Sequence, residues 1–277
     1  MLENLDTIPW SKLRHAYGVA KAIPQHICHL ASPQKETREK ALWELYGNIF
    51  HQGTRYQATP YAIPFLSELI ASPTVADRHE IVYLLVNLAL GYKEEYLSDG
   101  LDVAALRRGL EESDAQMSRA DRAECNKYGF GPRVDLACYD AVQKEVPTLF
   151  PLLTDEDVLL RRAVIYALAW FPDLAEQSLP RLQTQLAASA DDVERANLLL
   201  SLGFLARCSR RTIEEAVWRD ALQHPSLLVR VSAALGFARE PLTDPILAIL
   251  IQSIAATEQL QDRGADIHFN EGNLAGY

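Results

Sequence analysis

The fold is decided by residues 63–89, which run IPFLSELIASPTVADRHEIVYLLVNLA. A proline stands in the first turn of an apolar helical segment, where its missing N–H and fixed φ are well tolerated. A turn containing Ser72 and Pro73 follows, and Arg78 opens a second apolar segment. Residues three, four and seven positions after Arg78 share its side of a helix. The stretch therefore predicts a helix, a short turn and a second helix that buries the side carrying Arg78.

The same pattern recurs along the chain. An aliphatic residue and a proline open each first helix, and an arginine opens the second helix 14 or 15 residues later; the prolines are Pro24, Pro64, Pro147 and Pro180, and the arginines are Arg38, Arg78, Arg161 and Arg195. Arg230 opens a fifth copy without the proline. One hairpin cannot bury its own apolar face, so the copies must stack. We therefore predict an all-α fold, a right-handed α-solenoid of helical hairpin repeats with essentially no β-sheet.

Three segments depart from the repeat. Residues 98–145 occupy a step about two repeats long, so they hold either a degenerate repeat or an insertion. Residues 9–22 are expected to form a capping helix. Residues 262–277 contain glycines and asparagines without a period, which predicts a flexible C-terminal tail, or one that docks late. The prediction is thus a single solenoid over residues 1–261 followed by a tail.

Composition narrows the classes of function. The formal net charge is -10 and the sequence pI is about 5.2. A nucleic-acid backbone is bound by a basic face, so we expect no nucleic acid as partner. An acidic chain suits a basic protein partner, although solubility alone also explains the charge. The four cysteines form no closely spaced pair, so we expect no metal and no cofactor.

No segment suggests a membrane or a secretory route. The N-terminus lacks a basic stretch followed by an apolar one, and no apolar run approaches the roughly 20 residues that cross a bilayer. We therefore expect a cytoplasmic protein that does not associate with membranes. Motifs of nucleophilic or phosphate-binding enzymes are also lacking in the sequence, so we do not expect an enzyme.

The most unusual loop is HQGTRYQAT, residues 51–59, which joins two hairpins. His51, Arg55 and Tyr56 surround a glycine and are candidate contacts for a partner, because such loops present hydrogen-bond donors. The alternative is structural: His51 and Thr54 would only tie neighbouring helix ends.

A second group of candidates follows the second helices. Trp43, Tyr83 and Tyr166 lie five positions after their anchor arginines, and Asn87 lies nine positions after Arg78. These positions point away from the buried side, toward the concave surface that second helices line in a solenoid. Aromatic side chains there would form a binding groove. The alternative is that Trp43 and Tyr166 pack between adjacent repeats.

These residues carry a resemblance to a known family. The unit at 63–89 and the unit LPRLQTQLAASADDVERANLLLSLGFLA, residues 179–206, resemble HEAT repeats, and the similarity covers most of residues 9–257. The segments RHAYG (14–18) and IFHQGTRYQATPYAIPFL (49–66) resemble stretches of bacterial HEAT-repeat proteins, some of which are immunity proteins against polymorphic toxins. The resemblance implies a protein-binding scaffold, most concretely an immunity protein that neutralises a cognate toxin with a basic domain.

Two other functions remain open under this resemblance. A HEAT-repeat chain can be a structural adaptor in a larger assembly. It can also be an enzyme with a ligand site in the concave groove, similar to bilin lyases or to nucleobase-directed HEAT-like enzymes. In HEAT-like repeats the anchor arginine bonds turn acids or carbonyls of a neighbouring unit, which implies Asp77 and Asp157 as acid partners here.

Overall fold

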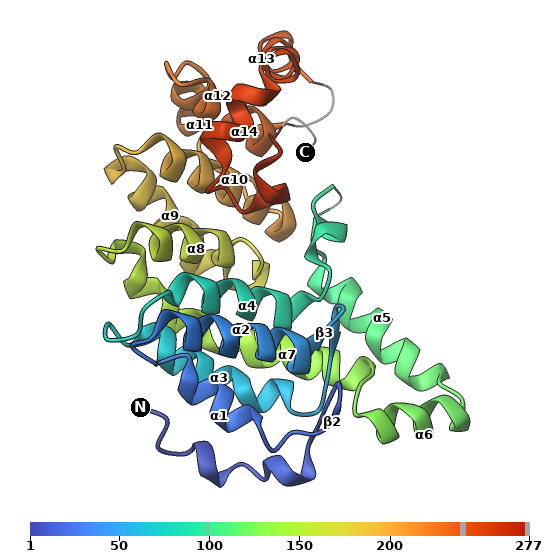
Figure 1. Ribbon diagram of the computed structural model, residues 1–277. Helices are drawn as coiled ribbons and strands as arrows, with labels where there is room; N and C mark the ends of the chain where they lie inside the picture. The colour runs from blue at the N-terminus through green and yellow to red at the C-terminus, as the bar shows by residue number, and fades with distance from the viewer. Residues whose placement is uncertain (99, 239–241, 275–277) are drawn as a thin grey trace. The chain divides into compact units, whose positions relative to one another are not determined.

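In a computed structural model the chain consists of α-helices joined by short turns, with two short β-hairpins (Figure 1). The structure describes residues 1–98, 100–238 and 242–274. The helices form two compact units: residues 1–93 with 103–152 are unit 1, and residues 94–102 with 153–277 are unit 2. The prediction of an all-α fold of stacked helical hairpins is confirmed.

Among the described residues, unit 1 contains helices α1 to α7 and strands β1 to β4. The helices are α1 (Ile23–His29), α2 (Lys35–Ile49), α3 (Thr59–Ala71), α4 (Arg78–Leu90), α5 (Val103–Gln116), α6 (Arg119–Tyr128) and α7 (Pro132–Glu145). The strands are β1 (Arg14–His15), β2 (Gly18–Val19), β3 (Phe50–His51) and β4 (Thr54–Arg55), paired as two antiparallel hairpins. The helices α1 with α2 and α3 with α4 are the first two repeats. α1 and α4 begin at the predicted proline and arginine signals, whereas α3 begins at Thr59 and contains Pro64 in its interior, and α2 begins three residues before Arg38.

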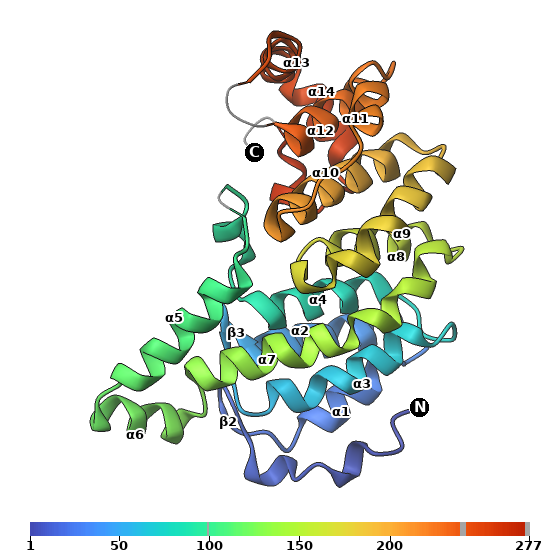
Figure 2. The same ribbon diagram turned by 180° about the vertical axis from the view of Figure 1, so that it is seen from behind.

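The segment at residues 98–145 resolves into two parts. α7 packs on α3 and α4 and extends the stack. By contrast, α5 buries only Val103 and α6 buries no residue, and both helices extend away from the rest of unit 1 (Figures 1 and 2). We call α5 and α6 the arm. Asp114 stabilises the arm through ion pairs with Arg122, at 3.0 Å, and with Arg133 of α7, at 2.8 Å. The arm therefore has the character of an insertion, after which α7 resumes the stacking.

Unit 2 contains the remaining helices. They are α8 (Val158–Leu168), α9 (Ala175–Ala188), α10 (Asp192–Ser209), α11 (Glu215–Leu222), α12 (Leu227–Phe237), α13 (Asp244–Ala255) and α14 (Thr257–Gly264). Its longest helix, α10, packs on α8, α9 and α12. Gly203 of α10 and Gly236 of α12 allow this close approach, because a Cβ on Gly203 would lie 2.3 Å from Gly236 Cα.

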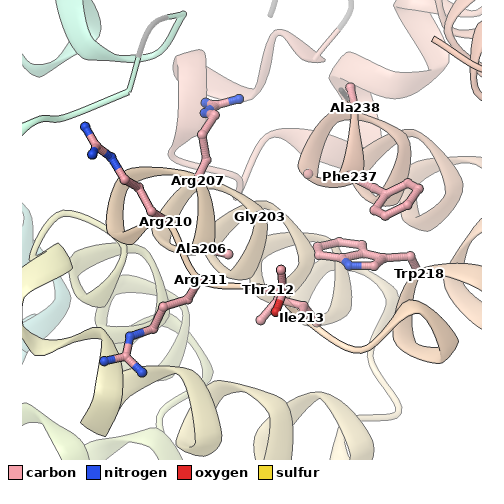
Figure 3. Close-up of a pocket in the computed structure, with 11 residues that line it drawn as sticks. Gly203, Ala206, Arg207, Arg210, Arg211, Thr212, Ile213, Trp218, Phe237 and Ala238 are labelled. Carbon is pink, nitrogen blue, oxygen red and sulfur yellow. The ribbon is translucent and has the colours of Figure 1, made fainter. Parts of the chain in front are cut away.

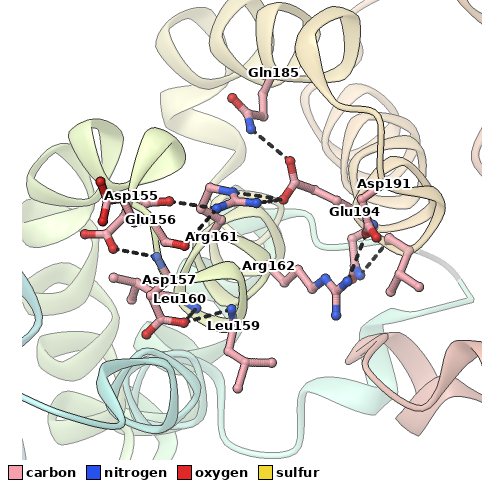
Figure 4. Close-up of polar contacts among 12 residues, drawn as sticks. Asp155, Glu156, Asp157, Leu159, Leu160, Arg161, Arg162, Gln185, Asp191 and Glu194 are labelled. Carbon is pink, nitrogen blue, oxygen red and sulfur yellow. Dashed lines mark hydrogen bonds and ion pairs between the residues drawn. The ribbon is translucent and has the colours of Figure 1, made fainter.

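The anchor arginines have the structural role expected of them. Arg38 donates from Nη1 to the carbonyls of Ser32 and Pro33, and its Nη2 lies 2.7 Å from Asp77 of the next repeat. Arg161 makes the same arrangement with its own turn and pairs with Glu194 of the next repeat at 2.9 Å (Figure 4). Each arginine thus closes its own turn and holds the following one.

Two details of this arrangement differ from the expectation. Asp77 is an acid partner as predicted, but Asp157 instead caps α8, accepting from the N–H groups of Leu159 and Leu160. The carbonyls that the arginines bond belong to their own turn and not to the neighbouring unit. The reason is reach, because a side chain at the start of the second helix lies directly over the turn that precedes it.

The N-terminal segment differs from the predicted capping helix. Residues 9–22 contain one 3₁₀ turn (Trp10–Lys12) and the hairpin of β1 and β2. Gly18 has a φ of 126°, which ends any helix there. The first-helix signal at Val146 and Pro147 also yields a 3₁₀ helix (Val146–Thr154), because Pro151 in its interior removes an N–H donor from an α-helical ladder.

The C-terminal segment is docked in the described residues 262–274. Phe269 is fully buried, and its ring lies 4.9 Å from that of Tyr166 and 6.1 Å from that of Trp170. Ile267 and Leu274 are buried with it. Of the two alternatives for residues 262–277, a flexible tail or one that docks, the described residues have the docked form, in which three apolar side chains hold the segment on unit 2. Residues 275–277 lie outside the described part.

Candidate protein-binding surface

The predicted loop at residues 51–59 contains the second β-hairpin. Only Gln52 and Gly53 lie between β3 and β4, and their φ values of 50° and 80° are those of a type I′ turn. A Cβ on Gly53 would lie 2.6 Å from the Tyr92 ring, so glycine permits both the turn and the ring. The hairpin therefore has a fixed shape and holds Tyr92 against its tip.

The first hairpin has Ala16 and Tyr17 at its turn. The Ala16 N–H donates to the carbonyl of Asn48, and the Ala58 N–H donates to the carbonyl of Arg14, each at 3.0 Å. Asn48 lies in the last turn of α2, and Ala58 immediately precedes α3. The hairpin is thus tied by its backbone to both repeats of unit 1.

His15 stabilises this turn through a hydrogen bond. Its Nδ1 accepts a 3.1 Å hydrogen bond from the Tyr17 N–H, so that nitrogen carries no proton. Burial lowers the pKa of His15; the charge of His26 lowers it further, and a hydrogen bond with the backbone of Val19 opposes the shift. The uncharged ring is therefore the form that fits the turn at neutral pH.

Tyr17 connects the two hairpins at the surface. It is 70% exposed, and its hydroxyl lies 3.3 Å from Nδ1 of His51. The two rings meet edge to face with centroids 5.3 Å apart. Because His51 begins the turn whose Gly53 contacts Tyr92, the three aromatic side chains form one patch.

Further aromatic side chains lie on α2 and at its end. Phe50 follows α2, and its ring lies 5.9 Å from that of Tyr46. Trp43, three residues before Tyr46, lies on the same side of the helix and is 71% exposed, more than any other large hydrophobic residue in the described part of the chain. An indole so open to water is typical of a binding surface.

The neighbouring helix α4 contributes Tyr83 and Asn87, both half-buried. The Asn87 amide donates to the Tyr46 hydroxyl at 3.0 Å and accepts from Lys93 Nζ at 3.0 Å. Burial raises the pKa of Tyr46 to about 12, so its hydroxyl stays protonated. We call the whole surface the aromatic face: Tyr17, Trp43, Tyr46, His51, Tyr83, Asn87 and Tyr92.

Four of the seven predicted contact residues lie on the aromatic face, namely Trp43, His51, Tyr83 and Asn87. Arg55 does not, because its guanidinium points inward: Nη2 lies 3.0 Å from Asp135 and Nη1 donates to the carbonyl of Gly53. Burial raises the pKa of Asp135 to about 6, against the charge of Arg55. Arg55 therefore joins the second hairpin to α7.

Tyr56 is also internal. It is buried, and its ring packs edge to face on that of Phe130 at 6.4 Å. Thr59 performs the helix-tying role that we considered for His51 and Thr54: its hydroxyl donates to the carbonyl of Ile49 and accepts from the Tyr56 N–H. The structural alternative thus describes the second half of the loop, and the binding hypothesis concerns only its first half.

Tyr166 is not available to a partner in this structure. It is 1% exposed and lies under His268 and Phe269, whose rings are each 4.9 Å from its own. Trp43 and Tyr166 occupy the same register position of their helices, yet only Trp43 is open. The difference comes from the docked C-terminal segment, which covers Tyr166.

Three residues of the aromatic face were not among the candidates: Tyr17, Tyr46 and Tyr92. Tyr17 belongs to the segment RHAYG (14–18), which resembles bacterial HEAT-repeat proteins but in which no contact residue was predicted. A usable signal was the dipeptide Gln52-Gly53, because a glycine in a two-residue polar turn marks a hairpin and hence a protruding edge. The position of Tyr92 had no such signal, since it depends on contact with Gly53.

Charge is unequally divided between the units. Acidic and basic side chains are equal in number in unit 1, so unit 2 carries the whole formal charge of -10. The aromatic face therefore belongs to a unit without net charge. Attraction to a basic partner would come from unit 2, and affinity on unit 1 would come from aromatic contacts.

Unit 2 has a basic pocket of about 370 Å³ beside the end of α10. Figure 3 shows its arginines pointing in different directions, away from Trp218. Arg207 donates to the carbonyl of Leu97, Arg210 lies 3.8 Å from Asp102, and Arg211 lies 3.7 Å from Glu176. Since these groups do not converge, the pocket lacks the focused charge of a ligand or catalytic site.

Comparison with known protein families gives a match over part of the chain. Residues 135–203 match the model of the HEAT repeats, from α7 into α10. This stretch is therefore similar to HEAT repeats. The matched stretch includes the Arg161–Glu194 pair, and HEAT repeats generally mediate protein–protein interaction. No curated protein and no solved structure matches the chain.

Two further features of the described residues bear on other functions. They include no group of three histidine, cysteine, aspartate or glutamate side chains placed to hold a metal ion. None of the helices in the described ranges combines the length and apolar character needed to cross a bilayer.

Proposed function

We propose that this HEAT-repeat chain acts by binding another protein, which it contacts through the aromatic face of unit 1. The observations that carry the proposal are the contact of Tyr17 with His51, the packing of Tyr92 on Gly53 and the open indole of Trp43 on α2, all within unit 1. Aromatic residues held in one geometry lose little conformational freedom on binding, so they are effective interface anchors.

The most concrete form of the proposal is immunity to a bacterial toxin. It is supported by the resemblance of residues 14–18 and 49–66 to bacterial HEAT-repeat proteins, some of which neutralise toxins. These segments are the two hairpins that carry Tyr17 and His51. In this proposal the chain covers the active site of the toxin, and its acidic unit 2 favours a basic toxin domain. We also propose that the chain performs no catalysis of its own.

The binding test compares matched variants in a pull-down from the native host, read by mass spectrometry. The variant Trp43→Ala/Tyr83→Ala removes two anchors, and Tyr61→Ala removes an exposed tyrosine of α3 outside the face. A partner of the wild type should be retained by Tyr61→Ala and lost by the double variant. Loss of two anchor residues weakens binding by roughly 100-fold or more. Equal capture by both variants would exclude the aromatic face.

The immunity test uses the captured partner. Its expression alone in a bacterial host should arrest growth, and co-expression with the wild-type chain should restore growth. Co-expression with Trp43→Ala/Tyr83→Ala should not. A partner that is harmless when expressed, or many subunits captured together, would replace immunity with an adaptor function. A retained small molecule and no protein partner would contradict the binding function itself.

A further inference from the structure

Helix α13 has two apolar sides, and only one of them is packed. Ile246 and Ser253 are buried, and the helix lies on α12 and α14. On the other side are Leu247, Ile251 and Ile254, which are 44%, 59% and 67% exposed. Their spacing of four and three residues places them in one stripe along the helix. We call this stripe the α13 face.

The α13 face has no charged side chain. Residues 245–256 run PILAILIQSIAA, without Asp, Glu, Lys or Arg, although they belong to the unit that carries the whole net charge. Figures 1 and 2 show α13 at an outer edge of unit 2. The nearest charge on this side of the helix is the exposed Asp244, one turn before Leu247, so a charged partner could pair only at that end, and burying its charges on the stripe itself would be costly. The surface is suited to an equally apolar and uncharged surface.

We propose that the α13 face binds a second copy of this chain in a two-fold symmetric dimer. The stripe is self-complementary, because an antiparallel pair of α13 helices places Leu247 close to Ile254 of the other copy and brings the two Ile251 side chains together near the axis. The two Asp244 side chains lie at opposite ends of this arrangement, so they do not meet. Unit 2 is otherwise acidic, so its other surfaces would repel each other in a dimer. An uncharged surface such as the α13 face allows two copies to approach closely.

The area is sufficient for a modest dimer. The three side chains expose on the order of 300 Å², within the range of functional apolar patches on monomers. With the neighbouring exposed Leu242 and the alanines of α13, two copies would bury on the order of 1,000 Å², the lower end of specific interfaces. Such a contact predicts a dissociation constant in the micromolar range, which rapid exchange between monomer and dimer would accompany.

The test measures sedimentation velocity of the full chain from about 1 to 200 µM. The wild type should shift from monomer to dimer, whereas Ile251→Glu should remain a monomer because two carboxylates would meet at the axis. The control is Leu159→Glu on α8, which adds the same charge to unit 2 at a side chain 42% exposed and should dimerise like the wild type. Circular dichroism melting verifies that both variants fold.

Salt gives a second measurement. Higher ionic strength screens repulsion between two acidic units, so the dimer should strengthen from about 50 to about 500 mM NaCl, whereas a contact built on ion pairs would weaken. A wild type that is monomeric at every concentration and salt would overturn the proposal. A dimer that Ile251→Glu does not dissociate would overturn its location. Neither result bears on the aromatic face, which lies in unit 1.

Discussion

The pair Arg161–Glu194 should be the most sensitive ion pair of unit 2. The Glu194 side chain is 2% exposed and that of Arg161 is 19% exposed, and the Glu194 carboxylate also accepts from the Gln185 amide at 2.9 Å (Figure 4). Glu194→Ala leaves a nearly buried guanidinium without its carboxylate. Arg161 keeps its bonds to the turn carbonyls, so the expected loss lies at the lower end for broken buried pairs, about 3 kcal/mol.

The double variant Arg161→Met/Glu194→Leu distinguishes the pair from simple loss of packing. Two apolar side chains of similar size leave no charge buried, so this variant should fold within about 1 kcal/mol of the wild type. The cycle of single and double variants then measures the coupling. Coupling arises because a lone buried charge is much less stable than either the pair or two apolar groups.

The assay is urea unfolding at pH 7 followed by tryptophan fluorescence. Trp170 and Trp218 report on unit 2, and Trp10 reports on unit 1. With an m-value of about 2 kcal/mol per molar urea, a loss of about 3 kcal/mol moves the unit 2 midpoint by about 1.5 M. The control Asp77→Asn breaks the matching pair of Arg38 in unit 1 and should move only the Trp10 transition. A shift below about 1 kcal/mol for Glu194→Ala, or a double variant less stable than the single one, would refute the reasoning.

Two further predictions concern the hairpins. The folded pKa of His15 lies below its ordinary value of 6.5, so the unfolded chain binds the proton at a higher pH than the folded chain does, and unit 1 should lose stability as pH falls through about 6.5. The variant His15→Asn keeps an acceptor for the Tyr17 N–H and does not titrate. Its urea midpoint should therefore fall less than that of the wild type between about pH 7.5 and 5.5. In thermal melting, Gly53→Ala should destabilise unit 1 by about 1–2 kcal/mol, because position 53 has a φ of 80° and its Cβ would overlap the Tyr92 ring. The control Gly47→Ala in α2, where a Cβ meets nothing within 4 Å, should stabilise unit 1 by up to about 1 kcal/mol. Equal effects of the two variants would contradict the assigned turn.

The repeat was predictable because the spacing of apolar residues within each helix encodes it locally. Apolar positions three and seven residues after Arg38, Arg78 and Arg161 are buried in the structure, as helical geometry requires. The hairpins were not predictable in this way. A strand of two residues is too short to show alternation, and its existence depends on the backbone bonds from Ala16 and Ala58 to distant segments.

The exposure of the candidate site depended on contacts that no local pattern contains. Trp43 and Tyr166 have the same place in their repeats, and the sequence treats them alike. Phe269, more than 100 residues after Tyr166, decides that one is buried while the other is open. Burial at a given register position is therefore a property of what the rest of the chain covers.

The arginine ladder has a second signature in the sequence, beyond the spacing of the anchors. The acid that pairs with Arg38 is Asp77, directly before Arg78, and the acid that pairs with Arg161 is Glu194, directly before Arg195. An acid followed by an anchor arginine thus joins a repeat to the one before it. Arg230 follows Val229, so the step between α10 and α12 lacks such an acid, and there the close contact of Gly203 with Gly236 joins the helices instead. Along unit 2, the contacts that join successive repeats therefore change from ion pairs to close apolar packing. The uncharged α13 face follows this apolar part of the unit.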